Sequence, residues 1–334
     1  MRVAVLGATG LVGREMVQIL EQRNFPVKEL LPLASPRSEG KKVLFRGEEI
    51  TVRRVSPEAF RGVGLALFSA GGGPSRQWAP LAAEAGAVVV DNSSAWRMVE
   101  DIPLVVPEVN PEDLARHKGI VANPNCSTIQ TVVALAPLHR KAVLRSLVTV
   151  TFQSVAGTGI AALRELEESS RSVLEDSSWS PRIYPHAIGF NVLPHIGDFD
   201  EAGIAQEEWK MMRESRKILH IPDLRVSCTA TRVPVFRGHG VSVTATFENS
   251  LSPEEARELL RGAPGITVAD DPRNNLYPLQ RNVANTDPVQ VGRLRGEPDF
   301  PKTLSFWVAG DNLRKGAALN AVQIGEALLE KGLL

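Results

Sequence analysis

The chain has 334 residues, a length that favours two domains over one. With 43% hydrophobic and 23% charged residues, its composition is that of an ordinary globular protein and excludes collagen-like and disordered chains. The 38 basic and 38 acidic side chains cancel, which gives no overall attraction to nucleic acid or an anionic membrane. No apolar run reaches the ~20 residues of a bilayer span and no signal peptide precedes the first strand, so we expect a cytoplasmic protein.

Short apolar strands alternate with helix-like segments in the first part of the chain. Residues 3–6 predict a buried strand, which a glycine turn connects to a helix with apolar residues at helical spacing up to residue 20. Four further apolar runs follow, VKELLPLAS, GLALFSAGGG, AVVVDNSS and IPLVVPE. This alternation predicts an α/β domain of the Rossmann type with a parallel sheet, which we assign to residues 1–124.

Longer strands with alternating apolar residues begin at residue 143. The segments LRSLVTVTFQSV, LRVSCTATRVPV and HGVSVTATFE are separated by helical stretches such as AALRELEESSRSVLED. They predict an α+β domain with a mostly antiparallel sheet, assigned to residues 125–315. Residues 316–332 have the apolar spacing of an amphipathic helix, which we expect to pack back on the first domain.

Three evenly spaced glycines lie in the first turn between a strand and a helix. Gly7, Gly10 and Gly13 form a G-x-x-G-x-x-G pattern. Small residues there let a pyrophosphate approach the backbone, and the N-terminus of the following helix presents free N–H groups. The glycines also suit a simple tight turn, but their position at the start of a βαβ series favours dinucleotide binding.

The end of the second strand indicates which dinucleotide to expect. An NAD site normally has Asp or Glu there, which holds the ribose 2′-hydroxyl. This chain instead has Ser35, Arg37 and Ser38. Hydroxyl groups and a guanidinium suit a 2′-phosphate, so we expect NADP as the cofactor. A polar turn with a solvated arginine, or the use of both NADP and NAD, stays open.

Cys126 is the candidate nucleophile. It opens an apolar helix after Asn-Pro-Asn, and a thiol at a helix N-terminus is biased toward the reactive thiolate. A free cysteine is commonly a buried small hydrophobe, but polar neighbours on both sides argue against an apolar core at this place. Cys228 lies within an alternating strand, and we assign it to packing. The two cysteines and six histidines form no metal-binding motif, so we expect no metal.

A dinucleotide site combined with a cysteine nucleophile indicates aldehyde oxidation or acyl reduction through a thioester. This chemistry needs an acid or base near neutral pH, for which histidine is best matched. His239 lies between two glycines in Arg-Gly-His-Gly, where backbone freedom allows it to be aimed at a site. A loop histidine is also commonly structural or solvated, and the spacing alone does not decide between these roles.

Seven motifs follow one another along the chain: GATGLVG, SSAWR, NPNCSTIQ, TFQSVAGTG, EEWKM, TRVPVFRGHG and GDNLRKGAA. In this order and at these separations they resemble the bacterial aspartate-β-semialdehyde dehydrogenase family, over essentially the whole chain. The resemblance implies an NADP-dependent, phosphate-requiring interconversion of L-aspartate 4-semialdehyde and L-aspartyl 4-phosphate. It also implies a place in the biosynthesis of lysine, threonine, methionine and diaminopimelate.

The resemblance assigns roles to individual residues. It implies that Cys126 forms the acyl-enzyme, that His239 acts as general acid and base, and that Gln153 orients the substrate. Arg232 would bind the substrate α-carboxylate, and Glu207 the substrate ammonium group. Lys210 would contact substrate and phosphate, the other phosphate contacts being Arg97 and Asn125. The implied cofactor contacts are Gly7, Thr9, Gly10, Leu11, Val12, Gly13, Ser35, Arg37, Ser38, Ala156, Gly157 and Asn312, of which Ala156 replaces the serine of many family members.

Two other functions stay open at this point. An N-acetyl-glutamyl-phosphate reductase shares the thioester chemistry, but it typically has Gly before its cysteine, where this chain has Asn125. A non-catalytic, NADP-binding regulatory relative would be expected to lose Cys126. Glu207 and Lys210, three residues apart on a predicted helix, also fit a plain surface ion pair. We expect a homodimer or a dimer of dimers, with no nucleic-acid or membrane partner.

Overall fold

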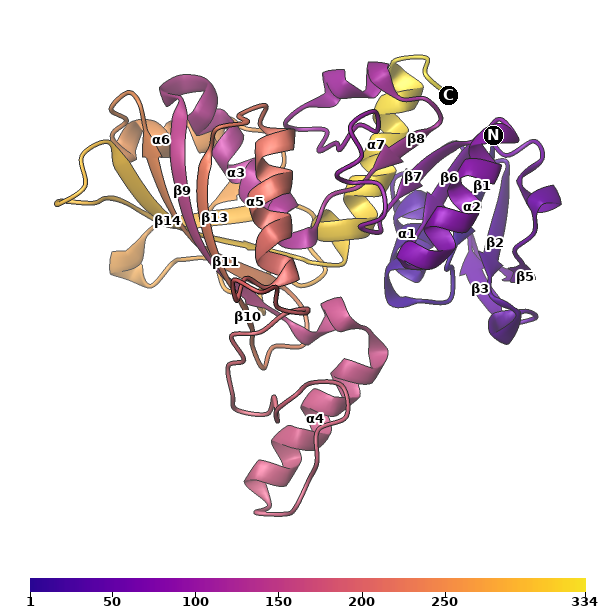
Figure 1. The fold of residues 1–334 in the computed structure, drawn as a ribbon, viewed down its shortest axis with the longest axis horizontal. Coiled ribbons are helices and arrows are strands. Elements are labelled where there is room, and N and C mark those ends of the chain that lie inside the picture. Colours follow the sequence, from indigo (N-terminus) through magenta and orange to yellow (C-terminus); the bar gives the residue numbers. More distant parts are fainter. The chain divides into compact units, whose positions relative to one another are not determined.

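A six-stranded parallel sheet organises the first of two units into which the chain divides (Figure 1). The computed structural model describes all 334 residues. The first unit comprises residues 1–125 and 317–334, and the second comprises residues 126–316. Every neighbouring pair in the first sheet is parallel. From edge to edge its strands are β5 (Arg53–Arg54), β2 (Glu29–Ala34), β1 (Arg2–Leu6), β6 (Leu65–Phe68), β7 (Val88–Asp91) and β8 (Ile120–Ala122).

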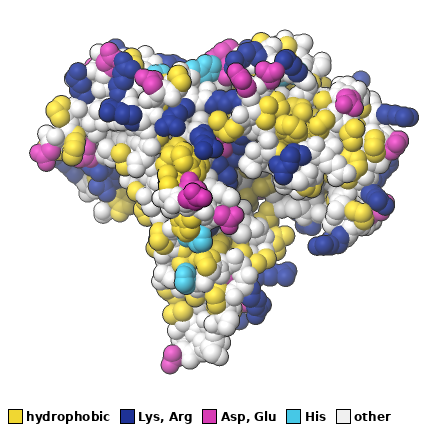
Figure 2. All heavy atoms as spheres, in the orientation of Figure 1, with side chains coloured by type: hydrophobic (Ala, Val, Ile, Leu, Met, Phe, Trp, Pro, Cys, Tyr) yellow, Lys and Arg dark blue, Asp and Glu magenta, His cyan; other side chains and the backbone are white.

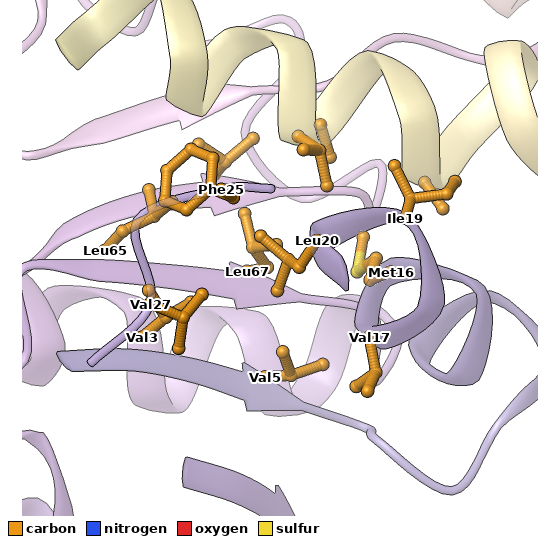
Figure 3. Close-up of a cluster of buried hydrophobic side chains, with 14 of the residues drawn as sticks. Val3, Val5, Met16, Val17, Ile19, Leu20, Phe25, Val27, Leu65 and Leu67 are labelled. Atoms are coloured by element: carbon orange, nitrogen blue, oxygen red, sulfur yellow. The ribbon is translucent and has the colours of Figure 1, made fainter. Parts of the chain in front are cut away.

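Both faces of this sheet are covered by apolar clusters, because side chains alternate along each strand. In β1, Val3 and Val5 belong to one cluster, with α1 (Leu11–Gln22) and α7 (Leu319–Glu330) (Figure 3). Ala4 and Leu6 belong to the opposite cluster, with α2 (Gly72–Glu84). The predicted Rossmann-type arrangement is therefore confirmed.

One predicted strand of this unit does not form. The run IPLVVPE was expected as a strand, but it makes only an isolated bridge between Leu104 and Ala122. Pro103 and Pro107 have no N–H to donate, which prevents a longer ladder. The sixth strand is instead the short β8. Two elements were not predicted: β5, and an antiparallel hairpin of β3 (Lys42–Phe45) and β4 (Glu48–Thr51).

The second unit is built on a mixed six-stranded sheet. Its central pairs, β9 with β11, β11 with β14 and β14 with β13, are antiparallel, which confirms the predicted mostly antiparallel sheet. The outer pairs are parallel, because long crossover connections separate their strands. From edge to edge the strands are β10 (Arg225–Arg232), β9 (Leu144–Gln153), β11 (His239–Phe247), β14 (Thr303–Gly310), β13 (Val289–Gly296) and β12 (Ile266–Val268).

Four α-helices belong to the second unit. They are α3 (Cys126–Ala142), α4 (Ile160–Leu174), α5 (Gln206–Ile218) and α6 (Pro253–Arg261). The Glu165 carboxylate of α4 is buried and accepts hydrogen bonds from the backbone N–H groups of residues 182, 183 and 184, which holds the following loop against the helix. A turn of π-helix, Arg314–Ala318, leads into α7. No helix combines the length and apolar character that a bilayer crossing needs.

Candidate active site

The strand register brings three candidate residues to one end of the second sheet. β9 and β10 are parallel, and their last residues, Gln153 and Arg232, are direct partners. β11 runs antiparallel to β9, so its first residue, His239, lies at the same end. The residues are far apart in sequence, and the sheet topology places them together.

Cys126 and His239 form a close pair. The Cys126 thiol is at the first residue of α3, where the positive end of the helix dipole favours a thiolate. Its Sγ lies 3.2 Å from His239 Nε2. The imidazole is fully buried, whereas Cys126 is partly exposed. A thiol within hydrogen-bond distance of an imidazole and open to an incoming molecule is the arrangement of a nucleophile with its partner.

The second thiol of the chain has the opposite environment. Cys228 is buried within β10. Burial raises the pKa of its thiol to about 12, so the reactive thiolate is scarce at neutral pH. This is consistent with a packing role for Cys228.

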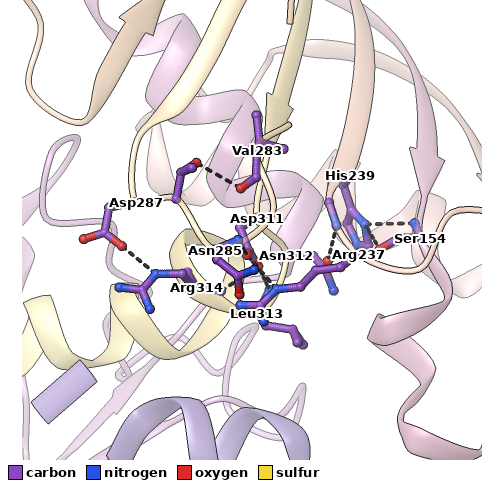
Figure 4. A network of polar contacts seen from close by, with 12 residues as sticks. Ser154, Arg237, His239, Val283, Asn285, Asp287, Asp311, Asn312, Leu313 and Arg314 are labelled. Carbon is purple, nitrogen blue, oxygen red and sulfur yellow. Dashed lines mark hydrogen bonds and ion pairs between the residues drawn. The ribbon is translucent and has the colours of Figure 1, made fainter. Parts of the chain in front are cut away.

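Ser154 and Asn312 hold the far side of the His239 ring (Figure 4). The Ser154 backbone N–H donates to His239 Nδ1 at 3.0 Å, and Ser154 Oγ lies 3.1 Å from the same atom. Asn312 Oδ1 accepts hydrogen bonds from Ser154 Oγ and from the Gly238 N–H. The Nδ2 of Asn312 is buried and has no protein partner. Asn312 was expected as a cofactor contact, and it also belongs to the support of His239.

Asp311 anchors the segment that carries Asn312. Its carboxylate is fully buried and pairs with Arg237 at 2.6 Å, just before β11. It also accepts hydrogen bonds from the backbone N–H groups of Asn285, Leu313 and Arg314 (Figure 4). Such a fully used buried carboxylate fixes the local backbone, and with it the loops on either side of His239.

Arg232 is a buried cation with an unused hydrogen-bond donor. The residue is 6% exposed, and its guanidinium donates a hydrogen bond from Nη1 to the Ser154 carbonyl oxygen at 2.7 Å. Its Nε has no partner. The ring of Tyr184 lies 5.9 Å from the guanidinium carbon, a cation–π distance. A buried guanidinium without a carboxylate partner is suited to bind an anionic group of a ligand.

Gln153 is linked to α5 by a chain of polar contacts. Its Nε2 donates to Glu207 Oε1 at 3.2 Å, and Glu207 Oε2 accepts from Lys210 Nζ at 2.8 Å. Gln153 and Glu207 are buried, whereas Lys210 is partly exposed. The Glu207–Lys210 pair is thus part of the Gln153 network and not an isolated surface ion pair.

Two glycines leave room beside the reactive pair. A β-carbon at Gly157 would lie 3.5 Å from Arg232 Nη1 and 3.8 Å from the His239 ring, while the neighbouring Ala156 is buried. A β-carbon at Gly316, in the π-helix, would lie 3.0 Å from the β-carbon of Cys126. π-Helical turns are frequent at functional sites, and this one brings backbone against the nucleophile.

We expect Gly316→Ala to lower kcat by about tenfold, because the added methyl pushes Cys126 away from its position and small displacements of reacting groups are costly. The control is Gly296→Ala, since nothing lies within 4 Å of a β-carbon at that glycine. Steady-state kinetics of both variants test this expectation. A Gly316→Ala enzyme with the wild-type kcat would contradict it.

The glycine turn of the first unit borders a pocket of about 620 Å³. Gly7, Thr9 and Gly10 line it at the N-terminus of α1, and Leu11, Val12 and Gly13 form the first turn of that helix. Gly7 has φ +88°, and a β-carbon on Gly13 would lie 2.1 Å from the Gly7 carbonyl oxygen. The spacing of the glycines therefore reflects close backbone packing at the strand-to-helix turn.

The end of β2 forms another part of this pocket. Ser35, Ser38 and Arg54 line it, and no lining residue is acidic. Arg54 lies in β5 and is the direct partner of Ala34, the last residue of β2. Arg37, by contrast, is exposed and is not among the lining residues. Arg54 was not among the predicted cofactor contacts, although the arginine pair in ITVRRVSP was the signal available.

Arg97 and Asn125 are buried in the first unit. The Arg97 guanidinium donates from Nε to the Asn123 carbonyl oxygen and from Nη2 to the Asn92 carbonyl oxygen, both at 2.9 Å. Asn92 follows β7 and Asn123 follows β8, so Arg97 joins the carboxyl ends of two neighbouring strands. Ligands of parallel α/β sheets bind at this edge.

Comparisons with known proteins give consistent results. Residues 2–117 match the family model "Semialdehyde dehydrogenase, NAD binding domain", and residues 135–315 match "Semialdehyde dehydrogenase, dimerisation domain". An aspartate-semialdehyde dehydrogenase of Aquifex aeolicus is 52% identical over 100% of this chain and 99% of its own. The crystal structure of aspartate semialdehyde dehydrogenase II from Vibrio cholerae, complexed with ASA, superposes with a TM-score of 0.96 at 42% identity, covering 98% of both chains. A Candida albicans structure with NADP gives a TM-score of 0.79 at 26% identity, covering 100% and 99%.

Proposed function

The chain belongs to the aspartate-semialdehyde dehydrogenase family and is an oxidoreductase, and we propose that it interconverts L-aspartate 4-semialdehyde and L-aspartyl 4-phosphate through a thioester on Cys126. The 52% identity with an aspartate-semialdehyde dehydrogenase over the full chain argues against an N-acetyl-glutamyl-phosphate reductase. The retained pair of Cys126 and His239 argues against a non-catalytic relative. The observation that carries the proposal is the 3.2 Å contact between Cys126 Sγ and His239 Nε2 beside the buried Arg232. The products would serve the biosynthesis of lysine, threonine, methionine and diaminopimelate.

Cys126 performs the bond exchange at the acyl carbon. In the reductive direction its thiolate attacks the carbonyl carbon of aspartyl phosphate, the C–S bond forms, and the C–O bond to phosphate breaks to release inorganic phosphate. When bound, NADP would supply the hydride chemistry: its reduced form would donate a hydride to the thioester carbon, and its oxidised form would accept one from the thiohemiacetal carbon that Cys126 forms with the aldehyde. His239 and Gln153 border the reacting carbonyl group and orient it.

The α-carboxylate and the ammonium group of the substrate are each bound by a side chain of opposite charge. Arg232 binds the α-carboxylate, which its unused Nε and its burial support. Glu207 binds the ammonium group from α5. Lys210, Arg97 and Asn125 serve the phosphate, for which cationic and amide donors are suited. The pairing of Lys210 with Glu207 keeps the lysine at the site when phosphate is absent.

The cofactor is NADP, and this chain has the groups to hold it. The glycine turn with Thr9 and Gly10 receives the pyrophosphate, and Ser35 and Ser38 receive the 2′-phosphate. The buried and unpartnered Nδ2 of Asn312 is an unused donor for the nicotinamide end. Arg37 is a weaker candidate than Arg54, because Arg54 lines the pocket.

We expect Arg54→Ala to weaken binding of 2′,5′-ADP by about fivefold, because a solvent-exposed charge pair is worth roughly 1 kcal/mol. Binding of 5′-AMP, which lacks the 2′-phosphate, is expected to stay unchanged. Arg53→Ala is the matched control, since successive side chains of a strand point to opposite faces. Titration calorimetry of both nucleotides with wild type, Arg53→Ala, Arg54→Ala and Arg37→Ala measures the effect. Equal losses for the Arg53 and Arg54 variants would contradict a specific role of Arg54.

The proposed reaction has a direct assay. Purified protein mixed with aspartate semialdehyde, phosphate and NADP is expected to produce reduced nicotinamide, detected by its absorbance, and the signal is expected to vanish when phosphate is omitted. Formation of reduced nicotinamide without any dependence on phosphate would refute the acyl phosphate product. Absence of any signal would refute the activity itself.

We also propose a homodimer, consistent with the dimerisation-domain match of the second unit. Large apolar side chains are exposed on the segment that follows α4, among them Phe190, Val192 and Phe199. On the face drawn in Figure 2, hydrophobic side chains are frequent on the part of this unit that carries α4. Exposed apolar surface of this kind is typical of contacts between protein chains.

A further inference from the structure

Two backbone carbonyl groups hold the buried Arg97 guanidinium, and the residues that supply them also contact each other. Arg97 donates from Nε to the Asn123 carbonyl oxygen and from Nη2 to the Asn92 carbonyl oxygen. The side chain of Asn123 donates from Nδ2 to Asn92 Oδ1. Because a guanidinium donates within one plane, the positions of these two carbonyl groups determine the direction in which Arg97 points.

The C-terminal segment of the chain holds the Asn123 side chain in place. Asn320, in the first turn of α7, donates from Nδ2 to Asn123 Oδ1 at 2.7 Å and to the Val105 carbonyl oxygen at 3.0 Å. Asn123 Nδ2 donates to the Ala317 carbonyl oxygen at 3.2 Å, shortly before α7 begins. Asn123 and Asn320 are both fully buried. The oxygen and the nitrogen of the Asn123 amide are therefore each bound by a residue of this segment.

Backbone carbonyl groups fix the orientation of both amides. A carbonyl oxygen only accepts hydrogen bonds, so the Asn320 atom that faces the Val105 carbonyl group must be the NH2 nitrogen. The Asn123 atom that faces the Ala317 carbonyl group must be its NH2 nitrogen for the same reason. Asn123 Oδ1 is then the atom that accepts from Asn320. Flipping either amide would place two oxygen atoms in contact, so the network has a single orientation.

An amide at position 320 contrasts with its neighbours in the helix. Leu319, Ala321 and Val322 are apolar and buried. Burying an amide costs free energy unless its polar atoms are paired, so an apolar residue at position 320 would pack at least as well. What Asn320 adds to packing is a pair of directed hydrogen bonds.

We infer that Asn320 is a positioning residue of the phosphate site, which acts through Asn123 on the direction of the Arg97 guanidinium. The inference rests on the proposed function, in which Arg97 contacts phosphate. In the oxidative direction a phosphate oxygen forms a bond to the thioester carbon, and the C–S bond breaks and returns its electron pair to the Cys126 thiolate. A guanidinium binds an oxyanion through paired N–H groups, so a rotated Arg97 binds phosphate less tightly.

Steady-state kinetics with phosphate as the varied substrate test this inference. Asn320→Leu removes both N–H donors at similar side-chain volume, and we expect it to raise KM for phosphate about tenfold, because small displacements of binding groups are costly. KM for aspartate semialdehyde and the affinity for 2′,5′-ADP are expected to stay unchanged. Gln323→Ala is the matched control, because it removes an amide from the same helix that contacts Glu108 and not Asn123. It is expected to leave all three constants unchanged.

A purely structural role of Asn320 predicts a different result. Asn320→Ala is the second variant, in case the leucine is not accommodated, and urea unfolding shows whether each variant is folded. A folded Asn320 variant with the wild-type KM for phosphate would show that the amide only fastens α7 to the sheet. An equal loss in all three constants would show a general loosening of the protein. Either outcome would overturn the inference.

The Arg97→Lys background tests whether the effect passes through the guanidinium. Lysine keeps the charge but lacks the planar group that the two carbonyl oxygens orient. Adding Asn320→Leu to Arg97→Lys is therefore expected to leave KM for phosphate unchanged, because residues that act through one another have non-additive effects. The same rise in KM as in the wild-type background would contradict the inference.

NMR of the ligand-free protein gives a readout that needs no activity. The Arg97 Nε–H signal of ¹⁵N-arginine, assigned by its loss in Arg97→Lys, reports the hydrogen bond to the Asn123 carbonyl oxygen. We expect Asn320→Leu to shift this signal and Gln323→Ala to leave it in place. An unshifted signal in Asn320→Leu would refute the positioning role while a phosphate-dependent wild type keeps the proposed function. A wild type without phosphate-dependent turnover would refute the proposed function, and this inference with it.

Discussion

Replacing Cys126 by Ala is expected to abolish turnover, with a loss of roughly 10⁴-fold or more in kcat, because no second nucleophile can form the thioester. The side chain is partly exposed at a helix start and not in the apolar core, so the free energy of unfolding is expected to change by less than about 1 kcal/mol. Steady-state kinetics and urea unfolding of the variant measure the two effects.

Cys228→Ala is the matched control for this experiment. Its thiol is buried and its pKa is raised to about 12, so the native enzyme is expected to react with iodoacetamide at Cys126 alone. The Cys228 variant is expected to keep its alkylation rate and its turnover. Equal labelling of both cysteines in the folded wild type, or substantial activity of Cys126→Ala, would refute the assignment of the nucleophile.

Arg232→Leu is expected to raise KM for aspartate semialdehyde by about 10- to 100-fold, which corresponds to a charge-assisted hydrogen bond of roughly 1.5–3 kcal/mol. The loss appears in KM because the α-carboxylate is bound in the ground state as well as in the transition state. An aldehyde of similar length without the α-carboxylate is expected to be turned over equally by wild type and variant, because it has no carboxylate for the guanidinium to bind.

Arg225→Leu is the matched control, because it removes the same charge from the same strand. Arg225 is the exposed first residue of the same strand, β10, and removing its charge is expected to leave KM unchanged. Arg232 also donates to the Ser154 carbonyl oxygen, which lies beside His239. If Arg232→Leu instead lowers kcat and leaves KM intact, the arginine positions Ser154 and the substrate carboxylate is bound elsewhere.

Much of the fold followed from the periodicity of apolar residues. Buried strands separated by helices identify a parallel sheet because both of its faces must be covered, and alternating strands identify an antiparallel sheet. The run IPLVVPE misled this reasoning, since its composition is strand-like and its two prolines limit pairing. The short β5 contains only two arginines and no apolar pattern, so periodicity could not identify it.

The candidate site was predictable only in part. Cys126 could be predicted because the evidence is local: the sequence itself shows a cysteine at the first residue of a helix. The support of His239 by Ser154 and Asn312 could not be predicted, because it rests on contacts between distant parts of the chain. Ser154 is 85 positions from His239, and Asn312 is 74 positions from its partner Gly238. Contacts at such separations are decided by sheet register. The register also determines that Arg54, and not Arg37, lines the pocket at the end of β2.

The return of the last helix to the first unit affects how the chain folds as it is synthesised. Leu319, Val322, Ile324 and Leu328 of α7 are fully buried in the cluster that also contains Val3 and Val5 of β1. The ribosome makes β1 before the second unit and α7 after it, so the dinucleotide-binding unit stays incomplete until α7 has been synthesised. The second unit, continuous in sequence, has all its residues available earlier. The first unit is therefore the first to be started and the last to be completed. Until α7 is made, the apolar face that α7 will cover is exposed, and molecular chaperones can bind it.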